Sequence, residues 1–248
     1  MNERTTKRRE NILSNIAIIP ARSGSKGLKD KNIKELNGIP LIAYSIKCAI
    51  ESRRFEKVFV STDSEIYAQI AEKYGADAHF LRSEKNSTDQ AGSWDVVKEV
   101  IECFEAEGMY FDNIMLLQPT SPLRTKEDIQ NSFRLMEEKK ANAVISVTEV
   151  DHSPLWCNTL SEDLLMDQFH NEKIVNTPRQ ELPTYYRING AIYLLNKNEL
   201  YNERLFKNKC YAYIMPNIRS LDIDTELDFK IAEYLFKENM FENSIKEQ

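Results

Sequence analysis

The stretch from Ile16 to Asn32 limits what this chain can fold into more than any other stretch does. It begins with an apolar run that ends at Pro20, a residue without the backbone N–H that a central strand requires. The twelve residues after Pro20 hold two glycines, two serines and four cationic side chains. Such a loop can place backbone N–H groups, hydroxyls and positive charge around an anion. The sequence therefore predicts a buried strand that opens into a polyphosphate-binding loop.

The spacing within this loop excludes the two common phosphate-binding motifs. It is not Gly-x-Gly-x-x-Gly, because Ser25 and Lys26 interrupt the glycines, and it is not a P-loop, because no Gly-Lys-Ser/Thr closes it. An ordinary strand-to-helix loop with solvated charges is the alternative interpretation of the local composition.

Composition and charge narrow the class of protein. A chain of 248 residues with 42% hydrophobic and 29% charged residues fits one α/β domain. The formal net charge of −6 argues against a general nucleic-acid binder or a partner of anionic membranes. The four cysteines have no metal-ligand or disulfide spacing, so we expect neither a zinc site nor a disulfide framework. No apolar run approaches the roughly 18 residues that span a bilayer, and we expect a cytoplasmic protein.

The charged beginning of the chain is expected to lie outside the folded domain. Residues 1–14 lack the apolar centre of a signal peptide, so we predict a flexible N-terminal extension. Residues 15–248 are then predicted to form a single domain.

Strand-like and helix-like segments alternate along this domain. Further strands are expected at 57–62, 78–81, 113–117, 143–147, 190–195 and 210–215, and helices at 40–50, 66–74, 94–107, 126–139 and 225–237. This order predicts an α/β fold with a mostly parallel twisted sheet, helices on both faces, and a ligand at the carboxyl ends of the strands. Between 149 and 183 the periodicity is lost, and a loop-rich span of this length is usually a functional excursion.

The segment from Gln118 to Arg124 follows a predicted buried strand. Its two prolines stiffen a turn that presents an amide, two hydroxyls and a guanidinium at the carboxyl edge of the sheet. The alternative interpretation is a helix cap, because Thr120, Ser121 and Thr125 all suit that role.

Two acidic residues near the end of the chain form a candidate metal site. Asp222 and Asp224 are two apart in an extended segment, so their carboxylates face the same side. Mg²⁺ commonly binds one or two carboxylates together with phosphate oxygens. Alternatively, Asp224 caps the final helix and Asp222 is solvated.

Taken in order, these segments resemble the acylneuraminate cytidylyltransferase family. The first motif is Arg-x-x-Ser-Lys-Gly-Leu-x-x-Lys-Asn from Arg22 to Asn32, the second is Gln-Pro-Thr-Ser-Pro-x-Arg from Gln118 to Arg124, and the last is Asp-x-Asp-Thr-x-x-Asp from Asp222 to Asp228. The resemblance spans about Ile16 to Asp228 and implies the Rossmann-like fold of a nucleotidyltransferase.

The resemblance also implies roles for individual residues. The implied nucleotide site consists of Ala21, Arg22, Ser25, Lys26, Lys31, Asn32, Arg82, Ala91 and Ser93, of which the last three face the base. The implied sugar-acid site consists of Gln118, Thr120, Ser121, Arg179, Gln180, Arg187, Asn189 and Tyr193. Catalysis is assigned to Arg22, Lys31, Asp222 and Asp224, and the two aspartates also hold Mg²⁺ as cofactor.

The implied reaction is cytidylyl transfer from CTP to the anomeric hydroxyl of a nonulosonic (sialic-type) acid, with release of pyrophosphate. The family also implies a homodimer in which residues 149–183 cross to the neighbouring subunit. None of the three histidines falls in a motif, which leaves the general base unassigned. N-acetylneuraminic, legionaminic and pseudaminic-type acids stay open as substrates.

Two other functions are alternatives to this one. A CMP-Kdo-type or other sugar nucleotidylyltransferase usually continues the loop as Arg-Leu-Pro, where this chain has Lys26, Gly27 and Leu28. A non-catalytic nucleotide-binding regulator would not need a second carboxylate at the C-terminal motif.

Overall fold

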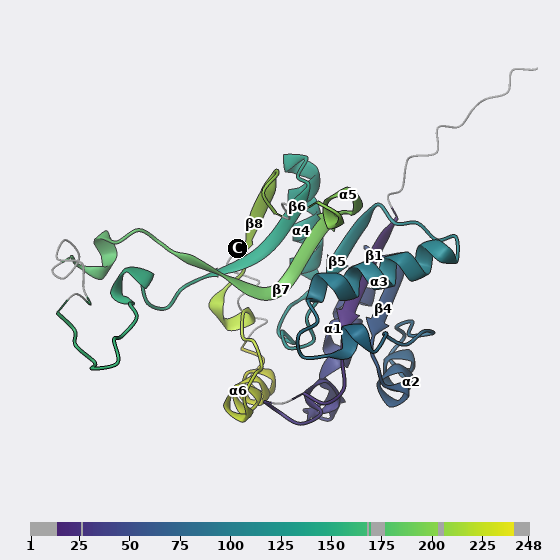
Figure 1. The fold of residues 1–248 in the computed structure, drawn as a ribbon, viewed down its shortest axis with the longest axis horizontal. Coiled ribbons are helices and arrows are strands. Elements are labelled where there is room, and N and C mark those ends of the chain that lie inside the picture. Colours follow the sequence, from purple (N-terminus) through teal and green to yellow (C-terminus); the bar gives the residue numbers. More distant parts are fainter. Residues whose placement is uncertain (1–13, 26, 168, 170–176, 203–205, 241–248) are drawn as a thin grey trace, which may run out of the picture.

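The computed structural model describes residues 14–25, 27–167, 169, 177–202 and 206–240, and a six-stranded sheet forms its centre (Figure 1). The strands in spatial order are β4 (Lys57–Ser61), β1 (Asn15–Pro20), β5 (Asn113–Leu116), β7 (Tyr186–Asn196), β6 (Ala143–Glu149) and β8 (Cys210–Ile214). Five of them run in one direction, and β7 is antiparallel to both of its neighbours. The predicted mostly parallel α/β sheet is confirmed, whereas the reversed direction of β7 was not predicted.

Helices cover both faces of the sheet, as predicted. The helices of the described chain are α1 (Leu41–Ser52), α2 (Glu65–Lys73), α3 (Ser93–Ala106), α4 (Lys126–Lys139), α5 (Lys197–Leu200) and α6 (Glu226–Lys237). Helices α1, α2 and α4 pack on one face of the sheet and α3 on the other. Successive side chains of β1 point to opposite faces, so Ile16 and Ile18 pack in the cluster that contains α3. Ala17 and Ile19 pack in the cluster that contains α1 and α4. No helix among the described residues has the length and apolar character needed to cross a membrane.

The end of the chain packs beside its beginning. Phe229 and Ala232 of α6 share a buried cluster with Leu36 and Leu41, which follow the glycine loop. The short strands β2 (Glu35–Leu36) and β3 (Ile39–Pro40) form a separate two-stranded sheet in this region. This packing brings the C-terminal acidic motif close to the cationic loop.

The predicted strand at 78–81 is not formed. Asp77 makes an isolated bridge to Phe59, and the partly buried ring of Phe80 stacks on Phe59 with ring centroids 4.4 Å apart. His79 is exposed, and its ring nitrogens contact Asp77 at 2.6 Å and Glu107 at 2.9 Å. The apolar pattern of this segment therefore reflects ring packing and not strand pairing.

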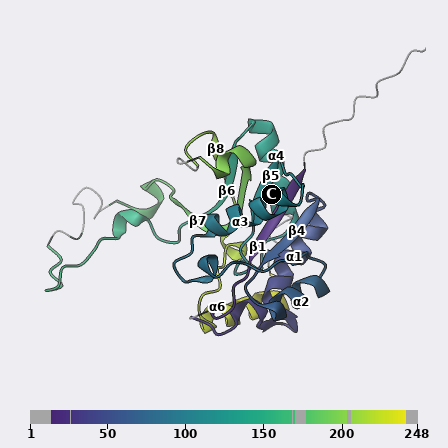
Figure 2. The ribbon, with the colours of Figure 1, turned by 45° about the vertical axis from the view of Figure 1, so that its right-hand side comes forward.

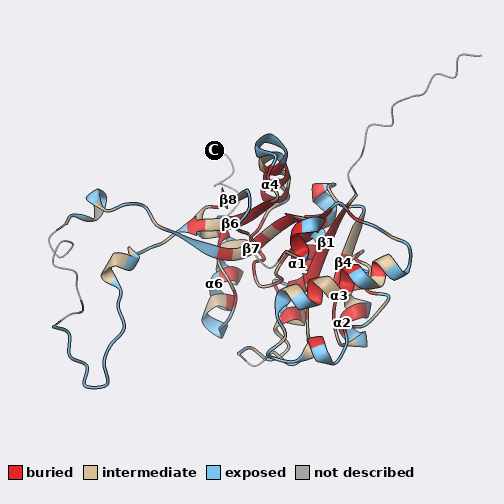
Figure 3. Cartoon of the chain, turned by 45° about the horizontal axis from the view of Figure 1, so that its top comes forward, coloured by how far each residue is buried: buried red, intermediate tan, exposed pale blue. Residues whose placement is uncertain are grey.

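The span between β6 and β7 leaves the body of the molecule as a long arm (Figures 1 and 2). Its described part contains two short 3-10 turns, η3 (Pro154–Trp156) and η4 (Arg179–Glu181). Burial is concentrated in the sheet and its helices, and the arm is exposed along most of its described length (Figure 3). The predicted N-terminal extension at 1–14 lies almost entirely outside the described residues.

Candidate active site

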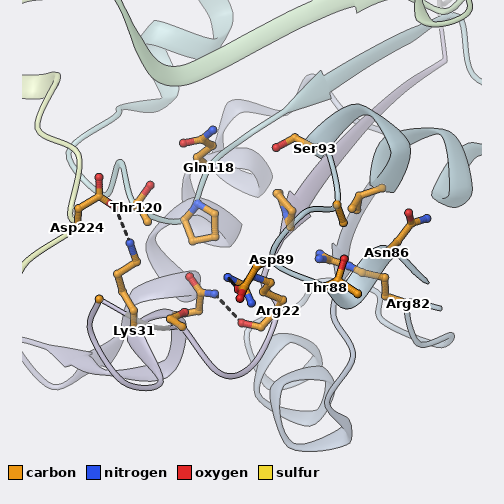
Figure 4. A pocket seen from close by; sticks show the side chains of 17 residues that line it. Arg22, Lys31, Arg82, Asn86, Thr88, Asp89, Ser93, Gln118, Thr120 and Asp224 are labelled. Carbon is orange, nitrogen blue, oxygen red and sulfur yellow. Dashed lines mark hydrogen bonds and ion pairs between the residues drawn. The ribbon is translucent and has the colours of Figure 1, made fainter. Parts of the chain in front are cut away.

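A cleft of about 540 Å³ opens at the carboxyl ends of β1 and β5 (Figure 4). Four segments far apart in the sequence line it: Pro20, Arg22, Ser25, Gly27, Lys31 and Asn32; Arg82, Asn86, Thr88, Asp89, Ala91, Ser93 and Val96; Gln118, Pro119 and Thr120; and Asp224. Figure 4 shows Lys31, Thr120 and Asp224 at one end, and Arg82, Asn86 and Thr88 at the other. Arg22 and Asp89 lie between these two ends. The predicted loop, base-side segment, proline turn and acidic motif thus converge on one cleft.

The glycine loop is held in place by hydrogen bonds at both ends. Ser23 donates its backbone N–H and its hydroxyl to the carboxylate of Asp63, at 2.7 and 2.8 Å. The side-chain amide of Asn32 donates to the carbonyl of Arg22 at 3.0 Å. A Cβ atom at Gly27 would lie 3.0 Å from the carbonyl oxygen of Asp224, so only glycine lets the loop approach the acidic motif this closely. Lys26 lies outside the described residues.

We predict that Asp63→Asn weakens the fold around this loop. Although burial acts to raise it, the hydrogen bonds from Ser23 lower the pKa of Asp63 below its ordinary value. A depressed folded pKa stabilises the protein above the unfolded value of about 4, and the contribution is lost as the pH falls through the folded pKa. The variant should lose about 1–2 kcal/mol in free energy of unfolding at pH 7. Urea unfolding at pH 7 and pH 3 checks this, and a difference from wild type that persists unchanged at pH 3 would contradict it.

The loop and the acidic motif meet through Lys31. Its Nζ donates to the carbonyl of Ile223 at 2.6 Å and pairs with Oδ1 of Asp224 at 2.9 Å (Figure 4). Lys31 is largely buried, whereas the side chain of Asp224 is 72% exposed. Two residues 193 positions apart in the sequence therefore present a positive and a negative group at the same end of the cleft.

Asp222 lies beside this pair, just outside the cleft lining. Burial raises the pKa of Asp222, and the nearby charge of Asp224 raises it further, while hydrogen bonding from Thr120 and the charges of Lys31 and Arg187 oppose the shift. Its Oδ1 is buried and has no hydrogen-bond partner within the described part of the chain. A buried carboxylate oxygen without a donor, next to a second carboxylate, fits the preference of Mg²⁺ for oxygen ligands.

Asp224 does not cap the final helix. Thr225 is the N-cap of α6, and it forms a capping box in which Thr225 N donates to Oδ2 of Asp228 at 2.7 Å and Asp228 N donates to Thr225 Oγ1 at 3.3 Å. The alternative interpretation of Asp224 as a cap is therefore wrong, and its carboxylate faces the cleft.

The proline turn divides into residues that face the cleft and residues that hold the turn. Gln118 and Thr120 line the cleft, whereas Ser121 is fully buried and its hydroxyl has no partner in the described structure. Arg124 is buried and donates to the carbonyl of Ala191 at 2.7 Å, so it supports the turn. The helix cap considered for this segment is supplied by Thr125, which forms a capping box with Asp128 in α4.

Two residues of β7, Tyr193 and Arg187, lie near Asp222. Tyr193 is half-buried against Trp94, with ring centroids 5.9 Å apart, and lies close enough to Asp222 to sense its charge. Arg187 is exposed and its guanidinium is 3.5 Å from the carbonyl of Ser220. Asn189, by contrast, is buried and donates to Ser220 Oγ at 2.8 Å, so it belongs to the core beneath the site.

Of the two predicted sugar-binding residues in the arm, Gln180 does not line this cleft within one chain. Gln180 lines a separate hollow of about 250 Å³ at the base of the arm, together with Glu149 and Tyr185. Arg179 opens the turn η4, and its side chain lies outside the described structure.

The base-side segment is built around Arg82. Its Nε donates to Ser61 Oγ at 3.0 Å and its Nη2 to the Ser61 carbonyl at 2.6 Å, and burial lowers the pKa of Arg82 to about 10. Ala91 and Ser93, two residues predicted to face the base, line the cleft. Ala21, which was predicted to bind the nucleotide, is buried, and its N–H donates to the Ser61 carbonyl at 2.8 Å.

Two further lining residues, Asn86 and Thr88, were not identified from the sequence. They lie in the polar stretch between Arg82 and Ala91, two residues predicted to face the base. This position in the sequence is the feature from which they could have been predicted. Glu99 of α3 fixes this stretch, because it accepts hydrogen bonds from the backbone N–H and hydroxyl of Ser83 at 2.6 and 2.9 Å.

Asp89 occupies the position in the cleft where an anion would neutralise Arg22. The two side chains form an ion pair of 2.7 Å across the cleft (Figure 4). A phosphate group that binds Arg22 must replace this carboxylate or accept a like charge beside it.

We predict that Asp89→Asn lowers the KM for the nucleotide. An exposed ion pair is worth about 0.2–1 kcal/mol, so removing this competitor should lower KM by up to about fivefold. Glu84→Gln, an exposed acid of the same stretch outside the cleft lining, is the control and should leave KM within about 1.5-fold of wild type. Steady-state kinetics with varied nucleotide checks the pair, and a raised KM in Asp89→Asn would contradict the prediction.

A cationic glycine loop that faces two carboxylates across the carboxyl edge of an α/β sheet defines the site of a nucleotidyltransferase. Solved structures share the fold: a CMP:2-keto-3-deoxy-manno-octonic acid synthetase complexed with CTP superposes with a TM-score of 0.69 at 16% identity, covering 91% of this chain and 99% of that one. A 4-diphosphocytidyl-2C-methyl-D-erythritol synthase from Anaerococcus prevotii gives 0.63 at 15% identity, covering 92% and 100%. The cytidylyltransferase family model matches residues 16–247, and the chain belongs to that family.

Curated relatives carry more specific names. An N-acylneuraminate cytidylyltransferase from Escherichia coli is 39% identical, over 88% of this chain and 51% of its own length. A CMP-N,N'-diacetyllegionaminic acid synthase from Legionella pneumophila is 32% identical over 90% of this chain and 97% of its own length. A pseudaminic acid cytidylyltransferase from Campylobacter jejuni is 33% identical over 92% and 98%. The chain thus spans about half the length of the Escherichia coli relative and nearly all of the other two.

Proposed function

We propose that this protein transfers a cytidylyl group from CTP to a nonulosonic acid and releases pyrophosphate. The single observation that carries the proposal is that Arg22, Lys31 and Asp224 line one cleft, with Asp222 beside Lys31 and Asp224. The names of the relatives supply the chemical class of both substrates.

The cleft suggests how the substrates lie. The triphosphate would contact Arg22 and Lys31, with Ser25 and Asn32 orienting it, and the cytosine would lie toward Arg82. The loop motif assigns Lys26 to the triphosphate as well. Positive groups fixed before the reaction stabilise the charge that develops as pyrophosphate leaves.

The acceptor would lie on the other side of the α-phosphorus. Thr120, Arg187 and Tyr193 lie close to Asp222 there, and Gln118 lines the cleft beside Thr120. Arg187 is suited to bind the carboxylate of a sugar acid. The anomeric hydroxyl attacks the α-phosphorus, the bond to the bridging oxygen of pyrophosphate breaks, and the hydroxyl proton leaves to a base. Of the histidines, His79 is bound to Asp77 and Glu107 and does not line the cleft.

Asp222 and Asp224 would hold Mg²⁺. The unpartnered Oδ1 of Asp222 and the exposed carboxylate of Asp224 fit this ion, and Lys31 stabilises Asp224 in its absence. When bound, the ion would supply charge neutralisation at the triphosphate.

The protein is proposed to act as a homodimer through its arm. Leu160, Leu164, Leu165 and Met166 of the arm are each more than half exposed. At the base of the arm, Val147 of β6 pairs with Ile188 of β7 and with Ile214 of β8, so three apolar side chains lie side by side on one face of the sheet. Such a surface is typical of an interface between copies, which would also bring Arg179 and Gln180 toward the neighbouring cleft.

Sedimentation velocity tests the dimer. Wild type should sediment as a dimer at working concentration, and Ile188→Glu should shift it toward monomer. Ile66→Glu, which changes an isoleucine on α2 that is also more than half exposed, is the matched control and should sediment as wild type. A monomeric wild type would contradict the proposal.

The activity is tested by incubating the protein with CTP, Mg²⁺ and one sugar acid at a time. Pyrophosphate and a CMP-sugar should form with at least one of the N-acetylneuraminic, legionaminic and pseudaminic-type acids. Turnover of an eight-carbon acid alone would favour the CMP-Kdo-type alternative, and CTP binding without any product would favour the regulator. Because the reaction consumes CTP, a cytoplasmic location is expected.

A further inference from the structure

A buried ion pair joins Arg219 to Asp128 directly beneath the acidic motif. The Nε of Arg219 donates to Asp128 Oδ2 at 3.1 Å and its Nη2 donates to Oδ1 at 2.9 Å, a two-point contact. Arg219 is 2% exposed and Asp128 is fully buried. Tyr213 of β8 donates its hydroxyl to Asp128 Oδ1 at 3.0 Å, and Thr125 N donates to Oδ2 at 2.9 Å. The carboxylate of Asp128 is thus fixed from three sides.

The two partners stand next to the two loops that build the site. Asp128 is in the first turn of α4, shortly after the proline turn that carries Gln118 and Thr120. Arg219 ends the 3-10 turn η5 (Asn217–Arg219), three residues before Asp222. The ion pair therefore ties the acidic motif to the proline turn.

Two further hydrogen bonds act on the same junction. Ile223 N donates to the carbonyl of Thr120 at 2.9 Å, between the two aspartates in the sequence. Ser220 Oγ accepts from Asn189 at 2.8 Å. With Arg219 anchored at one end, the short run from Ser220 to Ile223 has little freedom to move Asp222 relative to Thr120.

Stability by itself does not account for an ion pair at this position. Burying two charges has a large desolvation cost, and apolar replacements of buried pairs are often neutral or stabilising. What the pair supplies that an apolar contact lacks is a fixed orientation of the guanidinium, and with it of the chain that leads to Asp222.

We propose that Arg219 and Asp128 are positioning residues that set the placement of Asp222 and Asp224, and thereby the affinity of the site for a divalent cation and its turnover. The effect on turnover rests on the proposed function. The effect on cation binding rests only on the two carboxylates, Asp222 and Asp224. Residues that orient metal ligands from behind typically change metal affinity or activity by 10–100-fold when replaced.

The test compares Arg219→Lys with Tyr213→Phe and Asn15→Ala. Arg219→Lys keeps the charge but loses the two-point contact, whereas Tyr213→Phe removes one hydrogen bond to Asp128. Asn15→Ala removes buried hydrogen bonds to Arg54 and Asn113 at the opposite end of the sheet and is the control for stability. Urea unfolding, Mn²⁺ binding followed by electron paramagnetic resonance, and steady-state kinetics are measured for each protein.

We expect Arg219→Lys to weaken Mn²⁺ binding by about tenfold and to lower kcat similarly, with the KM for CTP within about twofold of wild type. Tyr213→Phe should change both by less than about threefold, and Asn15→Ala should lose stability with Mn²⁺ affinity unchanged. If Arg219→Lys lost stability but kept wild-type Mn²⁺ affinity and kcat, the role would be structural and the proposal overturned. If Arg219→Lys does not fold, Asp128→Asn takes its place in the same measurements, because its amide oxygen still accepts a hydrogen bond from Arg219. Absence of turnover in wild type would contradict the proposed function, whereas Mn²⁺ binding still tests the positioning role.

Discussion

Arg22→Ala is expected to lower kcat by about a hundredfold or more at saturating CTP. The guanidinium of Arg22 lies in the middle of the cleft, where it forms an ion pair with Asp89 at 2.7 Å. Losing one preorganised group that stabilises the transition state typically costs this much in rate. Pyrophosphate release under steady-state conditions measures the effect.

The matched control for this variant is Lys29→Ala. Lys29 is an exposed cation of the same loop that does not line the cleft, so its loss should change kcat by less than about twofold. Equal losses in both variants would indicate a general effect of loop charge, and normal turnover by Arg22→Ala would remove this residue from the site.

Asp222→Asn is expected to abolish most of the Mg²⁺-dependent turnover, again by about a hundredfold or more. The amide carries no negative charge and has one oxygen in place of two, so it is a weaker ligand for a divalent cation than the carboxylate whose Oδ1 is buried here. Binding of Mn²⁺ to the protein without substrates should weaken in parallel. The two measurements together separate a lost metal ligand from a lost proton acceptor, because the latter would reduce turnover alone.

Glu226→Gln is the control for the acidic motif. Glu226 is an exposed acid of the adjoining helix that pairs with Lys34 at 2.7 Å and does not line the cleft. It should bind Mn²⁺ and turn over as wild type does. Full activity of Asp222→Asn with Mg²⁺ would rule out a catalytic role for this carboxylate.

Local features of the sequence were sufficient for most of the fold. The apolar run that stops at Pro20 predicted β1, and the helical spacing that follows Thr125 predicted α4. The strand predicted at 78–81 does not form, because Phe80 stacks on Phe59 and Leu81 is exposed, and apolar content alone does not distinguish ring packing from strand pairing. The direction of β7 could not be predicted, because it depends on how the arm returns to the sheet.

The sequence also predicted part of the candidate site, and the rest became clear only in the structure. Residues with strong chemistry in short motifs, such as Arg22 and Lys31, lie where the motifs predicted a site. Ser121 and Asn189 belong to the same motifs but are buried, and a sequence motif does not separate a residue that contacts substrate from one that supports the contact. Asn86 lacks a motif and enters the cleft only through the conformation of its loop.

The sequence by itself determined the alternation of strands and helices, the cationic loop and the two aspartates of one extended segment, because these depend on residue type and spacing over a few positions. Only the tertiary structure decided that Lys31 pairs with Asp224 and that Arg219 anchors Asp128. Contacts between residues about a hundred or two hundred positions apart depend on the packing of α6 and β8 against the rest of the domain, and burial is a property of that packing.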